Sequence, residues 1–144
     1  MTPAQIQRVR NSFASAVLQL DAVSAAFCRH LSRLEPGRGA PFGGDPVIQR
    51  ITVGAALAGL VSSFGQLDRI RPQLQALGRE RARQGISAED YARVGEALVG
   101  ALHEVLGETF DAETRGAWIA AYGQIARAML AAGAAQDQIA AQAA

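Results

Sequence analysis

The sequence predicts an all-α fold, and three observations carry that prediction. Apolar residues make up 49% of the 144 residues but aromatic residues only 6%, and alanine and leucine dominate where strands would need β-branched runs. No segment alternates between apolar and polar residues with a period of two. Capping residues and prolines instead precede segments with helical apolar spacing. A chain of this length fits a single domain.

Clear signals bound the first two expected helices. Thr2 caps the first, Pro3 suits its first turn, and Gln5 completes a capping box. The buried stripe of this helix is expected at Ile6, Val9, Phe13 and Val17. The second helix runs from about residue 21 until a Glu-Pro-Gly sequence at 35–37 ends it. Its buried residues are expected to be Val23, Phe27, Leu31 and Leu34.

A loop over residues 37–44 precedes a strongly apolar helix. Asp45 and Pro46 begin that helix by the same combination of cap and proline. Residues 51–61 are apolar on nearly every side, and a helix of this kind is expected to be surrounded by other elements. Small residues would let another helix cross it at close range; they are Gly54, Ala55, Ala58 and Gly59.

Three further segments complete the helical pattern. After a break near Gly65, residues 67–83 carry leucine and isoleucine at helical spacing, but Pro72 and Gly78 predict a short or irregular helix. Ser87 caps a helix over about 88–105, and Asp111 caps the last one. The alanine- and glutamine-rich end is expected to fray, which leaves a domain over residues 1–134 and a tail over 135–144.

Charge and cysteine content exclude several classes of function. Fourteen basic and 13 acidic residues give a net charge of +1, so neither nucleic acid nor a membrane surface is an expected partner. One cysteine and two histidines cannot form a disulfide framework or a Cys/His zinc site, and no metal site is expected. Without a signal pattern or a membrane-spanning stretch, the expected location is the cytoplasm.

Short strings in a fixed order resemble those of one protein family. They are Thr2-Pro3-Ala4-Gln5-Ile6, Phe27-Cys28-Arg29, Pro41-Phe42, Leu67-Asp68, residues 72–78, 88–91 and 94–98, Ala117-Trp118 and Ala121-Tyr122-Gly123. Together they resemble single-domain bacterial haemoglobins and the haem domain of flavohaemoglobins over most of the chain. The resemblance implies a globin fold, in which six to eight helices form a three-over-three sandwich around a haem pocket.

The resemblance also implies which residues would stand on the ligand side of a haem. Phe42 would pack on the haem face, while Gln49 and Val53, four residues apart on one helix face, would form the wall above a bound ligand. Cys28 stands where relatives carry a tyrosine that hydrogen-bonds iron-bound oxygen. A thiol is a weak donor, so stabilisation of bound oxygen is expected to be poor.

Arg81 stands where the resemblance places the proximal histidine, which bonds the iron. Counting forwards from Pro72 and backwards from Tyr91 both reach this position. A guanidinium group stays protonated and has no lone pair for a metal. Relatives also orient the histidine with a tyrosine and a glutamate. Tyr91 keeps the tyrosine, but the glutamate position falls near Gly133, so two of the three parts are missing.

Neither histidine of the sequence is expected to replace the missing ligand. His30 lies about 200° around its helix from Cys28, and His103 lies off the apolar stripe of its helix. Two interpretations of Arg81 stay open. Its guanidinium lies in solvent on the surface of the helix, or it is buried at the pocket, where its charge would favour an acidic amphiphile as ligand. For Tyr91, the open alternatives are a core phenol and an iron ligand whose phenolate Arg81 stabilises.

The functional expectation is a divergent bacterial globin, haem-free or weakly haem-binding, that serves as a small-ligand sensor or interaction module. One alternative is a haem protein ligated by Tyr91 or water that binds oxygen or other diatomic gases; another is a binder of fatty acids or other acidic amphiphiles. No dinucleotide fingerprint is present, and an enzyme is not expected. The expected partners are a small molecule in the pocket and, through the last helix, a second copy. The candidate pocket residues are Cys28, Phe42, Gln49, Val53, Arg81 and Tyr91.

Overall fold

The computed structural model describes residues 1–64 and 66–143, so the break expected near Gly65 lies outside the described residues. The elements are α1 (Pro3–Val17), α2 (Leu20–Leu34), the 3-10 turn η1 (Pro41–Gly44), α3 (Pro46–Ser62), α4 (Leu67–Arg83), α5 (Ala88–Leu106), the 3-10 turn η2 (Gly107–Thr109) and α6 (Ala112–Ala143). These residues contain helices and no strand, which confirms the all-α prediction.

The helix starts lie where the capping residues predict them. The hydroxyl of Thr2 accepts the Gln5 N–H at 3.1 Å, and the Gln5 side chain accepts the Thr2 N–H at 2.9 Å. Asp45 accepts the Val47 N–H at 2.9 Å, and Asp111 caps the first turn of α6 in the same way. Each bond satisfies an N–H group that the helix itself leaves without a partner.

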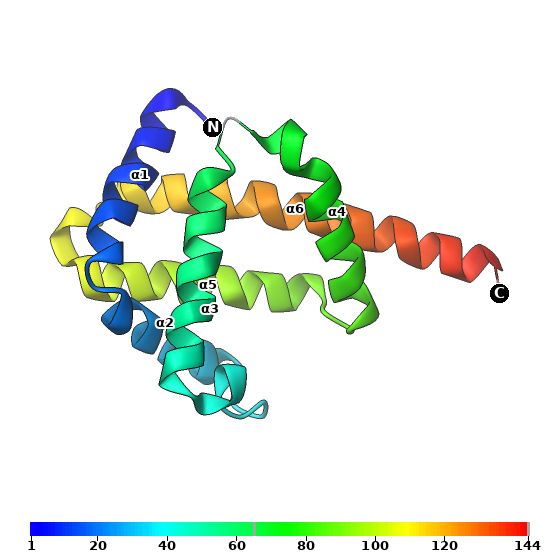
Figure 1. The fold of residues 1–144 in the computed structure, drawn as a ribbon, viewed down its shortest axis with the longest axis horizontal. Helices are drawn as coiled ribbons and strands as arrows, with labels where there is room; N and C mark the ends of the chain where they lie inside the picture. Colours follow the sequence, from blue (N-terminus) through cyan, green and yellow to red (C-terminus); the bar gives the residue numbers. More distant parts are fainter. Residues whose placement is uncertain (65, 144) are drawn as a thin grey trace.

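Two long antiparallel helices, α5 and α6, lie side by side through the molecule, and α3 crosses over them (Figure 1). Helices α1 and α2 cover one end, whereas α4 packs against α6 at the other. The core between them contains the fully buried Val9, Val23, Leu102 and Trp118. The Trp118 indole N–H donates to the Ser12 hydroxyl at 2.7 Å, so the polar edge of this large side chain is satisfied.

A buried carboxylate joins the loop after α2 to the start of α5. Asp90 accepts hydrogen bonds from the main chain and hydroxyl of Ser87, and it pairs with Arg38 and Arg93 at 3.0 and 3.1 Å. The Ser87 main-chain bond and the two arginines hold the pKa of Asp90 below its usual value, against the effect of burial. The loop is therefore held beside α5 by charge-assisted bonds.

Two expectations about burial are wrong. Val17 is 46% exposed, because α1 ends there and the chain turns into α2; Ala16 is buried in its place. Helix α3 is not surrounded, since Val47 and Ile51 on one of its faces are 65% and 63% exposed. Its opposite face is buried in the core through Val53 and other residues of the same stripe.

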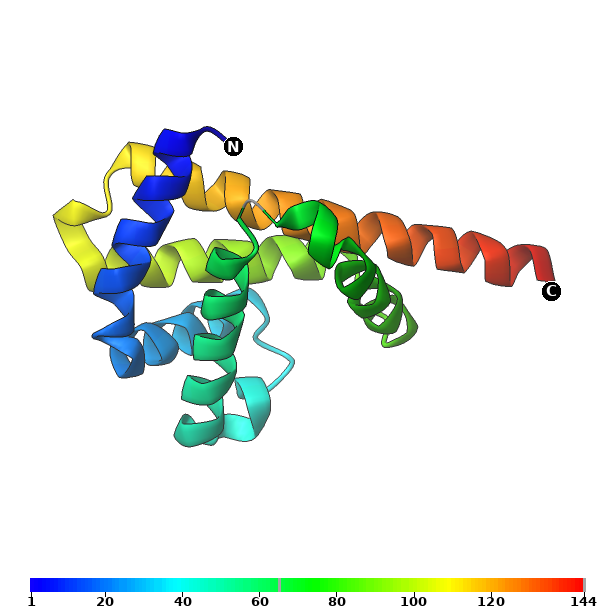
Figure 2. The same cartoon turned by 45° about the horizontal axis from the view of Figure 1, so that its top comes forward.

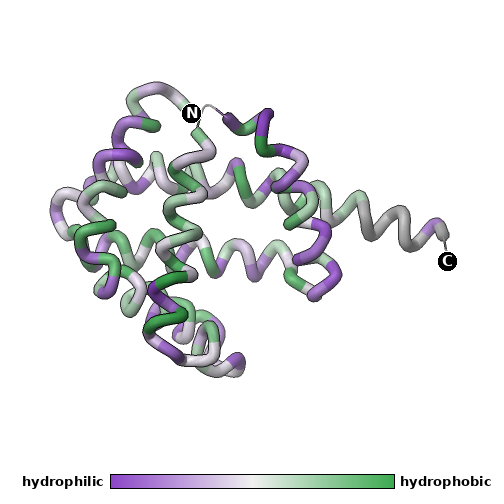
Figure 3. Tube along the Cα trace, viewed as in Figure 1, coloured by the Kyte–Doolittle hydropathy of each residue, from purple (hydrophilic) through white to green (hydrophobic). Residues whose placement is uncertain are grey.

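The expected short or irregular helix over residues 67–83 is also wrong, since α4 is one continuous helix. Pro72 lies near its beginning and removes a single helical hydrogen bond. Gly78 faces α6 so closely that a Cβ atom would collide with the main-chain carbonyl of Met129. On α6, a Cβ at Gly133 would lie 3.0 Å from the Cβ of Ala82. Close packing against α6 therefore keeps α4 intact, although most of its other residues are hydrophilic (Figure 3).

Helix α6 continues to residue 143, and its last part projects beyond the other helices (Figures 1 and 2). Fraying of this tail stays a prediction. The domain boundary at residue 134 stays a prediction. Among the described residues, no helix combines the length and the apolar character that crossing a bilayer requires.

Candidate functional site

An apolar cavity of about 480 Å³ lies between α3 and α4. Helix α3 supplies one wall and α4 the other, with α2, α5 and α6 behind them. The lining residues are Phe27, Val53, Ala56, Leu57, Gly59, Leu60, Ser63, Ile70, Gln73, Leu74, Leu77, Val94, Leu98, Tyr122, Ile125 and Met129. None of these side chains carries a formal charge at neutral pH, so the cavity favours apolar groups.

The cavity opens to solvent between its two walls. Leu77 of α4 lines it and is 47% exposed, and on the facing helix Ala56 and Gly59 are also exposed. Deeper in, Val53 and Leu57 are almost fully buried. A ligand could therefore enter beside Leu77 without any helix unfolding.

The two hydroxyl groups of the lining already have partners. Ser63 donates to the Leu60 carbonyl at 2.6 Å, and Tyr122 donates to the main-chain carbonyl of Tyr91 at 2.7 Å. Burial raises the pKa of Tyr122, and the neighbouring Tyr91 raises it further, so the phenol stays neutral. The remaining polar groups are the Gln73 amide and the Met129 thioether.

Of the six candidate pocket residues, Val53 alone lines this cavity. The Gln49 amide donates to the Pro41 carbonyl at 3.0 Å and so holds η1 against α3. Phe42 is 43% exposed and has a left-handed backbone with φ of 54°. Cys28 is buried, which raises the pKa of its thiol and makes a thiolate unfavourable. The structure therefore does not bring the predicted ligand-side residues together around one space.

Arg81 lies one turn beyond the cavity on the same stripe of α4. Ile70, Leu74 and Leu77 line the cavity, and position 81 follows Leu77 by four residues, which places it on the same helix face. Its side chain is exposed and donates to the Gln84 side chain at 3.2 Å. The position thus faces the cavity side of α4, while the guanidinium lies in solvent.

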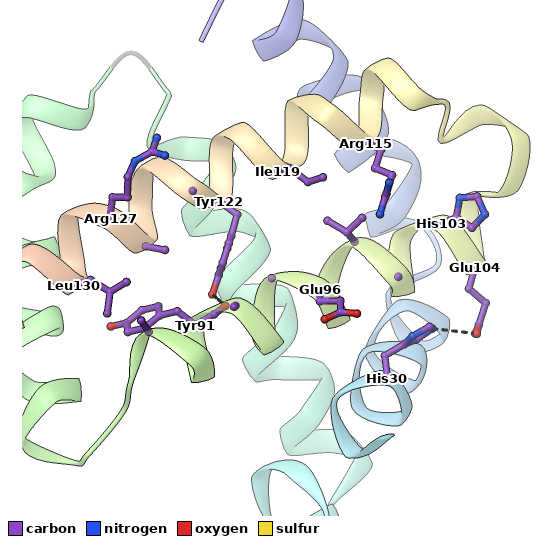
Figure 4. A pocket seen from close by; sticks show the side chains of 17 residues that line it. His30, Tyr91, Glu96, His103, Glu104, Arg115, Ile119, Tyr122, Arg127 and Leu130 are labelled. Carbon is purple, nitrogen blue, oxygen red and sulfur yellow. Dashed lines mark hydrogen bonds and ion pairs between the residues drawn. The ribbon is translucent and has the colours of Figure 1, made fainter. Parts of the chain in front are cut away.

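Tyr91 and both histidines line a different concavity, an open groove of about 1040 Å³ between α5 and α6 (Figure 4). The Tyr91 hydroxyl is buried without a hydrogen-bond partner. Burial raises its pKa, and the charge of Arg81 opposes that shift without reversing it. Tyr122 lines both the groove and the cavity, so its ring lies between the two spaces.

The two histidines lie towards the other end of the groove. The Nε2 atom of His30 is 3.4 Å from Glu104, which also forms a two-bond pair with Arg29 at 2.6 and 3.2 Å. The hydrogen bond from Arg29 lowers the pKa of Glu104. His103 is exposed and packs edge-on against Phe110. Neither imidazole lines the apolar cavity.

The cavity residues do not fit a haem of the kind that the resemblance implies. Such a haem needs an axial ligand, usually the imidazole of a histidine, with a polar group that orients the ring. The lining supplies an amide, a thioether and two hydroxyls that are already engaged, but no imidazole. Across the described residues, no three His, Cys, Asp or Glu side chains gather to hold a metal ion.

Sequence reasoning missed most of the lining. The helical spacing of Ile70, Leu74 and Leu77 was a signal for one wall, and that of Tyr122, Ile125 and Met129 for another. Apolar spacing alone does not distinguish a packed interface from the wall of a cavity, so neither stripe could be assigned to a cavity from the sequence.

Comparisons with known proteins identify relatives of the chain. The Globin family model matches residues 47–129. A flavohemoprotein of Bordetella parapertussis is 34% identical over 96 residues, which cover 62% of this chain and 24% of that protein. One of Bacillus subtilis is 33% identical over 82 residues, 57% of this chain and 21% of that protein. The chain thus spans less than a quarter of the length of these relatives.

A solved structure shows the same fold. The flavohemoglobin of Malassezia yamatoensis, determined with bound FAD and heme, superposes with a TM-score of 0.73 over 99% of this chain and 38% of its own. Sequence identity is 16%, so this likeness concerns the fold. It confirms the helical architecture that the sequence strings predict.

Proposed function

This chain belongs to the globin family, and from that premise we propose that it is a globin without histidine-ligated haem whose cavity binds a small apolar or amphipathic molecule. One observation carries the proposal: the space between α3 and α4 is lined by uncharged side chains and no imidazole. The protein then serves as a small-ligand sensor or interaction module.

The environment of position 81 supports this proposal. The position continues the cavity-facing stripe of α4, where the resemblance places an iron ligand, but it holds an exposed arginine. Tyr91 is no better placed, because its hydroxyl is buried beside the groove and its raised pKa keeps it a neutral phenol. Ligation of haem through the Tyr91 phenolate therefore has no support in this geometry, and ligation through water stays a prediction.

We further propose that the domain acts by binding rather than as an enzyme. The flavohemoprotein relatives are more than four times as long as the matched segment. Similarity over that segment alone therefore does not support assigning the activity of the full-length relatives to this chain. The polar side chains of the cavity hold no candidate nucleophile or general base, since its two hydroxyls donate to carbonyl groups.

Titration of the purified protein with hemin tests the proposal. We expect the absorbance spectrum to remain that of free hemin, because no nitrogen ligand faces the cavity. A Soret band that saturates at one haem per chain would overturn the haem-free interpretation. Native mass spectrometry of the protein as purified then identifies any bound small molecule.

An acidic amphiphile is a second candidate ligand, favoured by the position of Arg81. An acyl chain inside the cavity would leave past the exposed Leu77, and the guanidinium lies one turn further along α4. A carboxylate head group at the mouth would then meet a positive charge while its chain stays in apolar surroundings.

Substituting Arg81→Gln tests this second candidate. We expect the affinity for dodecanoate to fall roughly two- to five-fold, as for an exposed ion pair, while the affinity for dodecanol stays unchanged. Displacement of a fluorescent fatty-acid probe measures both. Equal losses for the acid and the alcohol would exclude a carboxylate contact at Arg81.

A further inference from the structure

One face of α3 leaves large aliphatic side chains in solvent. Val47 is 65% exposed, Ile48 49% and Ile51 63%. No charged residue occurs between Ile51 and Ser62, and the charge of Arg50 is paired with Asp21 at 2.6 Å. Together these three side chains expose on the order of 300 Å² of apolar surface, a size within the range of the largest apolar patches on monomeric proteins, which are often functional.

The same face changes character along the helix. Its first half carries the bulky Val47, Ile48 and Ile51, whereas its second half carries the small, exposed Ala58, Gly59 and Ser62. A Cβ built at Gly59 meets no atom within 4 Å, so the surface is open there. The two halves therefore have complementary shapes, with Ala55 between them.

We propose that α3 pairs antiparallel with α3 of a second copy, about a two-fold axis at Ala55. The axis places Ile51 opposite Gly59 of the other copy and Ile48 opposite Ser62, so each bulky side chain meets a small one. Small residues allow two helices to approach to the close end of the usual 8–10 Å interaxial distance. In the antiparallel arrangement the two helix dipoles point in opposite directions, so the positive end of each lies near the negative end of the other.

A second copy fits this face better than a charged partner does. The face is uncharged, so two copies bring no like charges together and leave no charge buried without a partner. Full burial of the bulky and the small residues of this face in both copies would cover at most about 1,000 Å² in total, which is the size of a weak, reversible interface. A charged partner would lose the hydration of its charges without compensation.

The proposed interface adjoins the mouth of the cavity. Ala56 and Gly59 line the cavity and are exposed beside the paired face. The second copy would therefore narrow the opening beside Leu77 and slow the exchange of a ligand. The pairing itself needs no ligand, so it stands independently of the proposed function.

Sedimentation velocity of the full chain tests the pairing, with two matched variants. Ile51→Glu places a charge at the proposed interface, and Ile119→Glu places the same charge on α6, where the isoleucine is 51% exposed and lines the groove. We expect twice the chain mass for the wild type and for Ile119→Glu, but a monomer for Ile51→Glu. Circular dichroism checks that both variants keep their helices.

A wild type that stays monomeric at 100 µM would overturn the proposal. A dimer that Ile119→Glu dissociates and Ile51→Glu leaves intact would also overturn it, in favour of pairing through the last helix. As a direct readout, Ala55→Cys in a Cys28→Ala background should form a disulfide between copies on mild oxidation, because residue 55 lies on the axis. Ala92→Cys, in the groove, should not.

Discussion

At the scale of single residues, Tyr91 combines a position that the family resemblance singles out with a buried hydroxyl that has no partner. The resemblance assigns it to a group with a histidine and a glutamate, and it places the histidine position at Arg81 and the glutamate position near Gly133. Its hydroxyl is buried and has no hydrogen-bond partner. A buried unsatisfied hydroxyl costs about 1–3 kcal/mol. The sequence allowed the loss of partners to be predicted, but the burial of the hydroxyl depends on packing that the sequence does not state.

Two tyrosine-to-phenylalanine substitutions compare the contribution to stability of a hydroxyl that has a hydrogen-bond partner with that of a hydroxyl that has none. Tyr91→Phe should raise the free energy of unfolding by about 1–3 kcal/mol, because it removes a buried group without a partner. Tyr122→Phe should lower it by about 1 kcal/mol, because the bond to the Tyr91 carbonyl is lost. Urea denaturation monitors both. The reverse order of stability would show that the Tyr91 hydroxyl is bonded after all.

At the scale of elements, local signals predicted where helices begin, and non-local contacts decided the rest. The starts of α1, α3, α5 and α6 follow from capping residues within a few positions of each start. The continuity of α4 could not be predicted, because Gly78 is stabilised in a helix by contact with Met129, far away in the sequence. The exposed face of α3 was missed for the same reason, since hydropathy does not say which neighbours are present.

The crossing of α4 and α6 can be tested with glycine-to-alanine substitutions. Gly78→Ala should lower the free energy of unfolding by roughly 1–3 kcal/mol, because the added methyl group meets the Met129 backbone. Gly116→Ala, in α6, should raise it by about 0.5–1 kcal/mol, since nothing lies within 4 Å and alanine favours a helix. Chemical denaturation measures both. A stabilised Gly78→Ala variant would disprove the close crossing.

At the scale of the whole molecule, the order and spacing of short strings were enough to predict a globin, whereas the lining of its cavity was not predictable. Val53 was carried over from the family pattern, and it lines the cavity because it lies on the buried face of α3. Three further residues came from the same pattern but do not line the cavity. Phe42 lies in the turn η1, Gln49 holds that turn through the Pro41 carbonyl, and Cys28 is buried in the core. Their roles depend on how far η1 and α2 lie from α4, which no local pattern encodes.

The same scale explains why one substitution can change the chemistry of the molecule. Position 81 continues the stripe of Leu74 and Leu77, so an imidazole there would lie at the edge of the apolar cavity. The arginine offers only donors and is drawn towards solvent, where it bonds Gln84. The fold thus keeps a space between α3 and α4 while lacking a metal ligand on that stripe.

The most direct test titrates hemin into the wild type, Arg81→His and Arg83→His side by side and follows the Soret absorbance. Only Arg81→His should gain a saturable band near one haem per chain, because it alone adds an imidazole on the cavity-facing stripe; Arg83 is exposed on another side of α4. A saturating band of equal affinity in all three proteins would mean that iron finds a ligand elsewhere in the chain, and would contradict the account.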